Sequence, residues 1–376
     1  MRIGLVTGEY PPMQGGVGAY SAILARMFAE HIHGVSVFTS PSAQEHDSRI
    51  RLMTAASRWS FSTLQTVKRW ARAEALDVVN LQFQTAAFGM SPFIHFLPDV
   101  LHPIPVVTTF HDLRFPYLFP KAGKLRDWIV MRLARASAGV IVTNHEDYAR
   151  LTALGQVTLI PIGSNIAVHV LPVVDVRQAN AKNQFLIGYF GLINHSKGLE
   201  TLLHSLKQLR DDGIDASLVL IGGTAGASDP TNQPYLREID DLITALELTP
   251  FVQRTGYIDD AYVSAWLKAV DVVALPFRDG ASFRRGSLMA AIQHECAIIT
   301  TQPVVPIPEF RDGDTMLLHP IDDVRALVAA CKRLHNDPVL RRTLSNHIAS
   351  LKNRFNWSSI TTETVQFFER ITEATA

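Results

Sequence analysis

Short apolar runs rich in β-branched residues alternate with helical patterns through most of this 376-residue chain. Such an alternation is typical of parallel sheets that helices cover on both faces. The strands predicted in the first half are residues 2–8, 34–40, 77–83, 105–110, 138–144 and 157–162. Those predicted in the second half are residues 185–191, 217–223, 251–257, 271–277 and 297–302. The sequence therefore predicts an α/β fold built of doubly wound sheets.

This pattern of strands and helices lapses once, between residues 163 and 184, where the sequence becomes polar and unpatterned. A chain of this length is also large for a single core. We therefore predict two Rossmann-like domains, residues 1–172 and 185–355, with a linker at 173–184 and a last helix at 356–376. Ligands of such sheets bind at the carboxyl ends of the strands. We expect the functional site in a cleft between the domains.

Helical periodicity is clearest in the second half of the chain. Five leucines recur there at the spacing that places them on one helix face, namely Leu199, Leu202, Leu203, Leu206 and Leu209. Further helical tracts follow at 322–336 and 338–354. We expect the leucine face to be buried against the second sheet.

Composition excludes several classes of protein. Lysine plus arginine equal aspartate plus glutamate at 35 each, which argues against a nucleic-acid-binding protein that works by bulk charge. Two cysteines, Cys296 and Cys331, are too few for a disulfide framework or a thiolate metal cage, and they favour a reducing compartment. The chain enters a strand without a basic leader, and it contains no apolar stretch of roughly 18 residues. We expect a cytoplasmic protein.

A glycine-rich loop follows the first predicted strand. Gly15, Gly16 and Gly18 precede an apolar helix that we expect to begin near Tyr20. Glycines let a ligand approach the backbone closely and expose amide groups at a helix start, which favours a phosphate or a sugar hydroxyl. The spacing matches neither the dinucleotide fingerprint nor the P-loop, and a flexible turn is the alternative interpretation.

Cations stand before two helices of the second half. Lys197 precedes Gly198 and the leucine-bearing helix, and Arg284 and Arg285 precede the apolar run that begins at Gly286. A cation at the positive end of a helix costs about 0.3 to 1 kcal/mol. A solvated side chain is the ordinary explanation for one such residue. Because the anomaly occurs twice after strands of one sheet, we predict that these cations converge on one anion, a diphosphate.

A histidine and an aspartate leave a predicted strand end of the first half, in the run VVTTFHDL. His111 at this position is suited to hydrogen-bond a bound substrate or to act as a general base, and Asp112 follows it. The alternative is a histidine that caps its own turn. His31 and His33 have no spacing that suggests a metal site.

The order of these loops resembles that of the GT-B glycosyltransferases of family 4 over essentially the whole chain. The resemblance rests on GGVGAY, TFHDL, VTLIPIGSN, GYFGLINHSKGLETLL, LVLIGG, VQRTGYIDDAYVSAWLKAVDVVALPF, HECAIITT and NWSSITTETVQFF. It implies transfer of a sugar from a nucleotide-diphosphate sugar to a saccharide or lipid-linked acceptor, with retention of configuration and without a metal or other cofactor. It further implies that the carboxy-terminal domain holds the nucleotide and the amino-terminal domain the acceptor, and that the last helix crosses back to the first domain.

The resemblance assigns roles to individual residues. Lys197 falls on the family's diphosphate-binding lysine, and His111 on its histidine near the transferred sugar. Gly15 and Gly16 fall on the loop that faces the donor phosphate. The matching backbone segment at the nucleobase is Tyr257 and Ile258. Family members are thought to use the leaving phosphate as the base, so no strong catalytic carboxylate need be visible.

We assign Tyr20 and Asp112 to the acceptor, because they lie in the domain that the resemblance makes the acceptor domain. Gly286, next to the two arginines, is assigned to the donor.

The sequence departs from the family pattern at three places. Leu192 stands where the family has an arginine that partners its lysine, and the positions of two family glutamates hold Ser282 and Ala290. A slipped register offers Asp279 for the first glutamate. We hypothesise that Arg284 and Arg285 replace the missing arginine, and that Asp279 or Ser282 touches the donor sugar. The departures leave two alternatives open: a non-catalytic nucleotide-binding subunit, and another catalyst such as a nucleotide-sugar epimerase or a phosphorylase.

Basic residues gather in two tracts of the first domain. Residues 49–73 carry six lysines and arginines and no acid, and residues 121–139 carry five more against one aspartate. Trp59, Trp70 and Trp128 are interleaved with them, as in helices that lie on an anionic bilayer. Solvated basic helices are the ordinary explanation. The tracts raise the hypothesis of a peripheral contact with the inner face of the plasma membrane.

Overall fold

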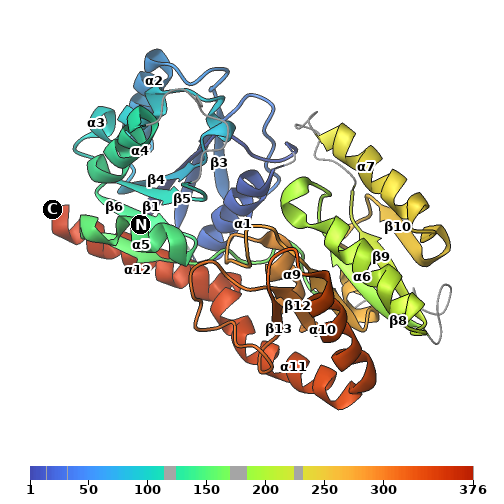
Figure 1. Cartoon of the computed structure of the whole chain (residues 1–376). Helices are drawn as coiled ribbons and strands as arrows, with labels where there is room; N and C mark the ends of the chain where they lie inside the picture. The colour runs from blue at the N-terminus through green and yellow to red at the C-terminus, as the bar shows by residue number, and fades with distance from the viewer. Residues whose placement is uncertain (14, 32, 114–123, 170–183, 224–231, 376) are drawn as a thin grey trace. The chain divides into compact units, whose positions relative to one another are not determined.

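The structure is a computed structural model, and it describes residues 1–13, 15–31, 33–113, 124–169, 184–223 and 232–375. The chain divides into two compact units. Unit 1 comprises Met1–Gly163 together with Trp357–Ala376, and unit 2 comprises Ser164–Asn356. Each unit contains one parallel sheet with helices around it (Figure 1). The predicted linker at 173–184 lies almost wholly outside the described residues.

Unit 1 holds a seven-stranded parallel sheet with the order β3-β2-β1-β4-β5-β6-β7. Its strands are β1 (Arg2–Thr7), β2 (Gly34–Thr39), β3 (Ile50–Thr54), β4 (Val78–Phe83), β5 (Val106–Phe110), β6 (Gly139–Val142) and β7 (Val157–Leu159). Its α-helices are α1 (Gly16–Glu30), α2 (Phe61–Ala73), α3 (Leu97–Leu101), α4 (Lys124–Ala136), α5 (His145–Leu151) and α12 (Trp357–Thr375). All six strands predicted for the first half are confirmed.

One strand of unit 1 was not predicted from the sequence. β3 is one of the two edge strands of the sheet, and in it only Ile50 is buried while Arg51 and Met53 are exposed. Because an edge strand needs no continuous apolar run, its sequence IRLMT does not stand out from the basic tract that surrounds it.

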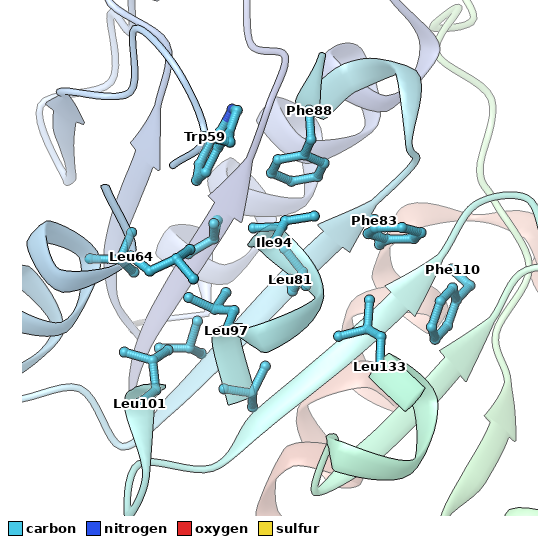
Figure 2. Packing of buried hydrophobic residues seen from close by; sticks show 14 of the residues in the cluster. Trp59, Leu64, Leu81, Phe83, Phe88, Ile94, Leu97, Leu101, Phe110 and Leu133 are labelled. Carbon is cyan, nitrogen blue, oxygen red and sulfur yellow. The ribbon is translucent and has the colours of Figure 1, made fainter. Parts of the chain in front are cut away.

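The two faces of the first sheet carry separate cores. Phe83 and Phe110 of neighbouring strands, with ring centroids 5.4 Å apart, pack with side chains of α2, α3 and α4 on one face (Figure 2). The opposite face packs against α1 and α12. A Cβ atom on Gly139 of β6 would lie only 2.9 Å from Phe367 of α12. The last helix therefore lies directly on the sheet of unit 1.

Trp59 and Trp70 belong to the first of these cores, with 8% and 4% of their surface exposed. The interpretation of these tryptophans as part of a membrane-facing surface is therefore wrong, because their rings fill the space between α2 and the sheet. Trp128, on α4, is 53% exposed. Every helix among the described residues is too short or too polar to span a membrane.

Unit 2 holds a six-stranded parallel sheet with the order β10-β9-β8-β11-β12-β13. Its strands are β8 (Phe185–Phe190), β9 (Ala216–Ile221), β10 (Val252–Gly256), β11 (Val272–Leu275), β12 (Ile298–Thr301) and β13 (Leu317–His319). Its α-helices are α6 (Leu199–Asp211), α7 (Asn232–Ala245), α8 (Asp260–Ala269), α9 (Gly286–Gln293), α10 (Val324–Asn336) and α11 (Pro338–Leu351). The five predicted strands are confirmed, and the leucine face of α6 is completely buried.

β13 was not predicted, since three residues at a sheet edge are too short to form a recognisable pattern.

The order of the strands locates the point in each sheet at which the chain reverses its direction of winding. In unit 1 this point lies between β1 and β4, and in unit 2 between β8 and β11. The loops that leave the carboxyl ends of these strands diverge there, which makes them the expected ligand-binding loops of each unit.

Candidate functional site

Two cations of unit 2 meet on one aromatic ring. Phe277 follows β11 and is completely buried. The Nζ atom of Lys197 lies 5.0 Å from the centroid of its ring, and the Cζ atom of Arg285 lies 4.8 Å from the same centroid. Since β8 and β11 are paired parallel strands, the loops that follow them lie side by side at one edge of the sheet, and the two cations lie close together there. The predicted convergence of Lys197 and Arg285 is therefore present in the structure.

Lys197 lies at the end of a short 3₁₀ helix, His195–Lys197, and Gly198 then begins α6 as its N-cap. Gly198 adopts a left-handed conformation with a φ of 65°, and a Cβ atom there would lie 2.1 Å from the carbonyl oxygen of Pro276. Only glycine allows this approach of the two loops. Burial, together with the nearby Arg285 guanidinium, lowers the pKa of the Lys197 ammonium group to about 7.

Arg285 is the N-cap residue of α9, so the two arginines stand at the positive end of this helix as expected. Their side chains are only 10% and 11% exposed, and both form ion pairs with the carboxylate of Asp279. The Nη2 atom of Arg284 lies 3.3 Å from Oδ2 of Asp279. The carboxylate offsets the repulsion between the guanidinium groups and the helix end. Asp279, one of the two residues predicted to touch the donor sugar, is paired with the two arginines in this structure.

The first turn of α9 adds polar groups beside these cations. Gly286, its first residue, is exposed, and Ser287, its second, is 7% exposed. The Oγ atoms of Ser287 and Ser282 are buried without a hydrogen-bond partner among the described residues. A Cβ atom on Gly191, just after β8, would lie 3.8 Å from Oγ of Ser287. Amide groups at a helix start together with an unpartnered buried hydroxyl are suited to bind an anion.

Apolar side chains lie at the carboxyl ends of β8 and β10. Tyr257 is 81% exposed and Leu192 is 45% exposed. Gly223, after β9, lies between them, since its Cβ position is 3.9 Å from Leu192 Cδ2 and 4.0 Å from Tyr257 Cβ. Ile258 follows Tyr257 and is half-buried. Leu192 therefore extends an exposed apolar surface at the position of the family arginine.

Ala290 is completely buried inside α9. At the position of the family's second glutamate the chain thus presents neither a polar group nor an exposed surface.

The glycine loop of unit 1 begins its helix earlier than predicted. α1 starts at Gly16, with Gly15 as its N-cap, rather than near Tyr20. The carboxylate of Glu9 accepts a hydrogen bond from the backbone N–H of Gly18 in the first turn, while burial raises its pKa. A Cβ atom on Gly15 would lie 2.1 Å from Oε2 of Glu9, whereas one on Gly16 would meet open space.

Glu9 was missed by sequence reasoning, although an acid after the first strand is the signal that could have found it. Because its carboxylate occupies the start of α1, a phosphate there would meet a like charge. This favours the sugar hydroxyl among the two ligands predicted for the glycine loop.

His111 follows β5, and its Nε2 atom lies 2.8 Å from Oε1 of Gln82 on β4. Burial lowers the pKa of the His111 imidazolium to about 4, so the ring is neutral at pH 7. The ring of Tyr20 meets that of His111 edge-on, with centroids 4.8 Å apart. Tyr20 is only 3% exposed and also packs on Trp357, so it supports His111 and does not present its ring to solvent. Asp112 is half-buried next to His111.

The structure thus places the predicted residues in loops and helix starts that follow the strands of each unit. In unit 1 the hydrogen-bonded histidine has Tyr20 and Asp112 beside it, and the glycine loop holds Glu9. In unit 2 the cations, Asp279 and the start of α9 lie together, and Tyr257 and Ile258 follow β10 while Leu192 follows β8, on either side of β9. Among the described residues no group of three or more histidine, cysteine or acidic side chains could hold a metal ion.

The chain has two doubly wound domains, the second with a cluster of cations at the carboxyl ends of its strands, which is the architecture of the GT-B glycosyltransferases. A family model described as glycosyl transferases group 1 matches residues 184–337, and one described as glycosyltransferase family 4 matches residues 14–167. Together they span most of the chain, which belongs to this family of glycosyltransferases.

Relatives in sequence agree with this assignment, and solved structures agree with the fold. The chain is 24% identical to the phosphatidyl-myo-inositol mannosyltransferase of Mycolicibacterium smegmatis, over all of this chain and 95% of the relative. Sucrose-phosphate synthase from Thermosynechococcus elongatus superposes with a TM-score of 0.80 at 22% identity over the whole of both chains. Anabaena HepE in complex with UDP gives a TM-score of 0.78 at 16% identity, over 98% of this chain and 100% of that chain. These structures have the same fold.

The pair Gly15 and Gly16 provides a test of the glycine loop. We expect Gly15→Ala to lower the free energy of unfolding by about 1 to 3 kcal/mol, because the methyl group displaces the Glu9 carboxylate from the Gly18 amide. Gly16→Ala, with open space around its Cβ position, should change it by less than about 0.5 kcal/mol. Urea denaturation measures both. Equal effects of the two substitutions would contradict this description of the loop.

Proposed function

We propose that this protein transfers a sugar from a nucleotide-diphosphate sugar to a hydroxyl group of a saccharide or lipid-linked acceptor, with retention of anomeric configuration and without a metal ion. The observation that carries the proposal is the placement of Lys197 and Arg285 on the ring of Phe277, beside the start of α9. Retention is carried over from the family resemblance.

The diphosphate fits this place for electrostatic reasons. Lys197 is held where burial and a second cation disfavour its charge, so an anion that binds there gains a charge-assisted hydrogen bond and relieves the repulsion between the cations. Each such bond contributes about 1.5 to 3 kcal/mol. The N–H groups of Gly286 and Ser287 and the Ser287 hydroxyl add neutral donors. These groups would stabilise the charge that develops on the departing diphosphate.

Two further features concern the nucleotide and the transferred sugar. Tyr257 and Leu192 offer an exposed apolar surface to a nucleobase at the ends of β10 and β8. The complexes of HepE contain UDP and UDP-glucose, which supports a nucleoside-diphosphate sugar as donor. In unit 1, the neutral imidazole of His111 and the carboxylate of Glu9 are suited to hydrogen-bond sugar hydroxyls.

We further propose a lipid-linked acceptor approached at an anionic membrane surface. The relative in M. smegmatis is named for transfer to a phosphatidyl-myo-inositol, which supports such an acceptor. Phe61, Phe93 and Trp128 are 55%, 44% and 53% exposed, and they lie on α2, η2 (Phe93–Phe96) and α4. η2 contacts both of these helices, and α2 also carries lysine and arginine. Cys296 and Cys331 are free and buried, which fits a reducing cytoplasm.

Calorimetric titration with UDP, GDP and ADP tests the diphosphate site. With whichever nucleotide binds, Lys197→Met and Arg285→Ala should each weaken affinity roughly tenfold or more, because each removes a charge-assisted bond. Ser287→Ala should have a smaller effect of about 2- to 10-fold. Arg210→Ala is the matched control, because the Arg210 guanidinium also lies on a phenylalanine ring, 3.3 Å from the Phe251 centroid, at the far end of α6.

Unchanged affinity in the Lys197 and Arg285 variants, or an equal loss in the control, would contradict the proposed site. Turnover is tested separately: the binding nucleotide, as its sugar conjugates, is incubated with lipid and saccharide acceptors, and the products are identified by mass spectrometry and their anomeric configuration by NMR. Nucleotide binding without hydrolysis or transfer would favour the non-catalytic alternative.

Flotation with vesicles tests the membrane contact. We expect binding to vesicles that contain phosphatidylglycerol at low salt, weaker binding at high salt, and none to neutral vesicles. The basic residues are attracted to the anionic lipid, salt screens this attraction, and the exposed aromatic rings insert into the membrane interface. Phe93→Ala combined with Trp128→Ala should abolish flotation, while Tyr262→Ala, an exposed aromatic residue of unit 2, should not. Flotation that does not depend on anionic lipid or on these two aromatic residues would contradict the proposal.

A further inference from the structure

Two amide side chains are buried in the middle of the first sheet. Asn80 and Gln82 occupy alternate positions of β4, a central strand, and neither has any exposed surface. The other face of this strand carries the apolar side chains of Val79, Leu81 and Phe83. Burial of an amide without hydrogen bonds costs several kcal/mol, and a strand covered on both faces is normally apolar throughout. These amides therefore depend on the partners that the fold gives them.

The orientation of the Asn80 amide follows from its neighbours on β5. Its Nδ2 atom lies 2.9 Å from the carbonyl oxygen of Val107 and 3.0 Å from Oγ1 of Thr109. A backbone carbonyl can only accept a hydrogen bond, so the NH₂ group of Asn80 must face it. The Oδ1 atom of Asn80 then points the other way and is an acceptor.

The orientation of the Asn80 amide determines that of the Gln82 amide, which in turn determines which nitrogen of His111 carries the proton. The Nε2 atom of Gln82 makes a hydrogen bond to Oδ1 of Asn80, which leaves Oε1 of Gln82 as the acceptor that faces His111. The Nε2 atom of His111 lies 2.8 Å from this oxygen and must donate. In a neutral imidazole the proton is then on Nε2, and Nδ1 carries a lone pair. The direction of every bond thus traces back to one peptide carbonyl.

We propose that Asn80 and Gln82 are positioning residues that fix the tautomer of His111, so that its Nδ1 atom accepts a hydrogen bond from a substrate hydroxyl and cannot donate one to a phosphate oxygen. This inference rests on the proposed function, since it gives His111 a sugar hydroxyl as ligand. It also gives the two units different ligands. The cations proposed to bind phosphate are in unit 2, and the histidine proposed to accept a hydrogen bond from a sugar hydroxyl is in unit 1.

Nitrogen-15 NMR of the imidazole, in the protein without substrate, measures the tautomer directly. In the unsubstituted protein we expect His111 to show a protonated, pyrrole-type Nε2 and an unprotonated, pyridine-type Nδ1. Gln82→Met removes the acceptor with little change of volume, and should give a mixture of tautomers or a protonated Nδ1. The same substitution should lower kcat/KM for sugar transfer roughly tenfold and leave the affinity for the free nucleoside diphosphate unchanged.

Two further variants distinguish positioning from simple packing. Gln82→Glu should restore the Nε2-protonated ring, because a carboxyl group accepts from Nε2–H in either protonation state. Thr109→Val, the matched control, removes one partner of the same Asn80 amide but keeps the Val107 carbonyl, so the tautomer should not change.

A pyridine-type Nε2 in the unsubstituted protein, or an unchanged tautomer in Gln82→Met, would overturn the proposal. Because the NMR measurement needs no substrate, its failure is distinguishable from a failure of the proposed function, which would show as absent nucleotide binding with the tautomer as expected.

Discussion

The cations of unit 2 are the interaction on which the proposed function of this protein depends. A lysine and an arginine lie on the ring of Phe277, next to a helix end of the same sign, and burial disfavours the charge of the lysine. Asp279 offsets part of this repulsion. Such an arrangement costs stability, since a buried lysine with a lowered pKa is destabilising below that pKa and the penalty fades as the pH rises above it. An anion with two or more charges offsets this cost in the folded protein.

The doubly wound sheets explain why these groups meet. Paired strands that run in the same direction bring their following loops to one edge, and at the point of reversal the loops separate enough to admit a ligand. In unit 2 this edge carries charges that suit a diphosphate. In unit 1 it carries Glu9, His111 and the amides beneath the histidine, which suit hydroxyl groups. This difference in chemistry between the two edges is the one that the proposed function requires, with the diphosphate in unit 2 and sugar hydroxyls in unit 1.

The strands and the cationic loops could be predicted because both leave local signals, an apolar run or a charge of the wrong sign before a helix. Two edge strands could not, because β3 has no continuous apolar run and β13 has only three residues. Trp59 and Trp70 look like surface residues among lysines and arginines, and only the packing of α2 shows that they are core residues. The path from Val107 to His111 depends on neighbours distant in sequence, and the pairing of Asp279 with both arginines depends on the conformation of the loop before α9. Asn80 and Gln82 did leave a signal, as polar residues within an apolar strand.

The most direct test of the central interaction is the pKa of Lys197. It is measured by an NMR titration of the ¹³Cε and ¹Hε resonances of Lys197, with and without a nucleoside diphosphate that binds. Without nucleotide we predict a value near 7. Bound diphosphate should raise it, because the negative charge stabilises the ammonium form, and affinity should therefore fall as the pH rises above 7. A pKa in the ordinary range of lysine that nucleotide does not change would contradict the account.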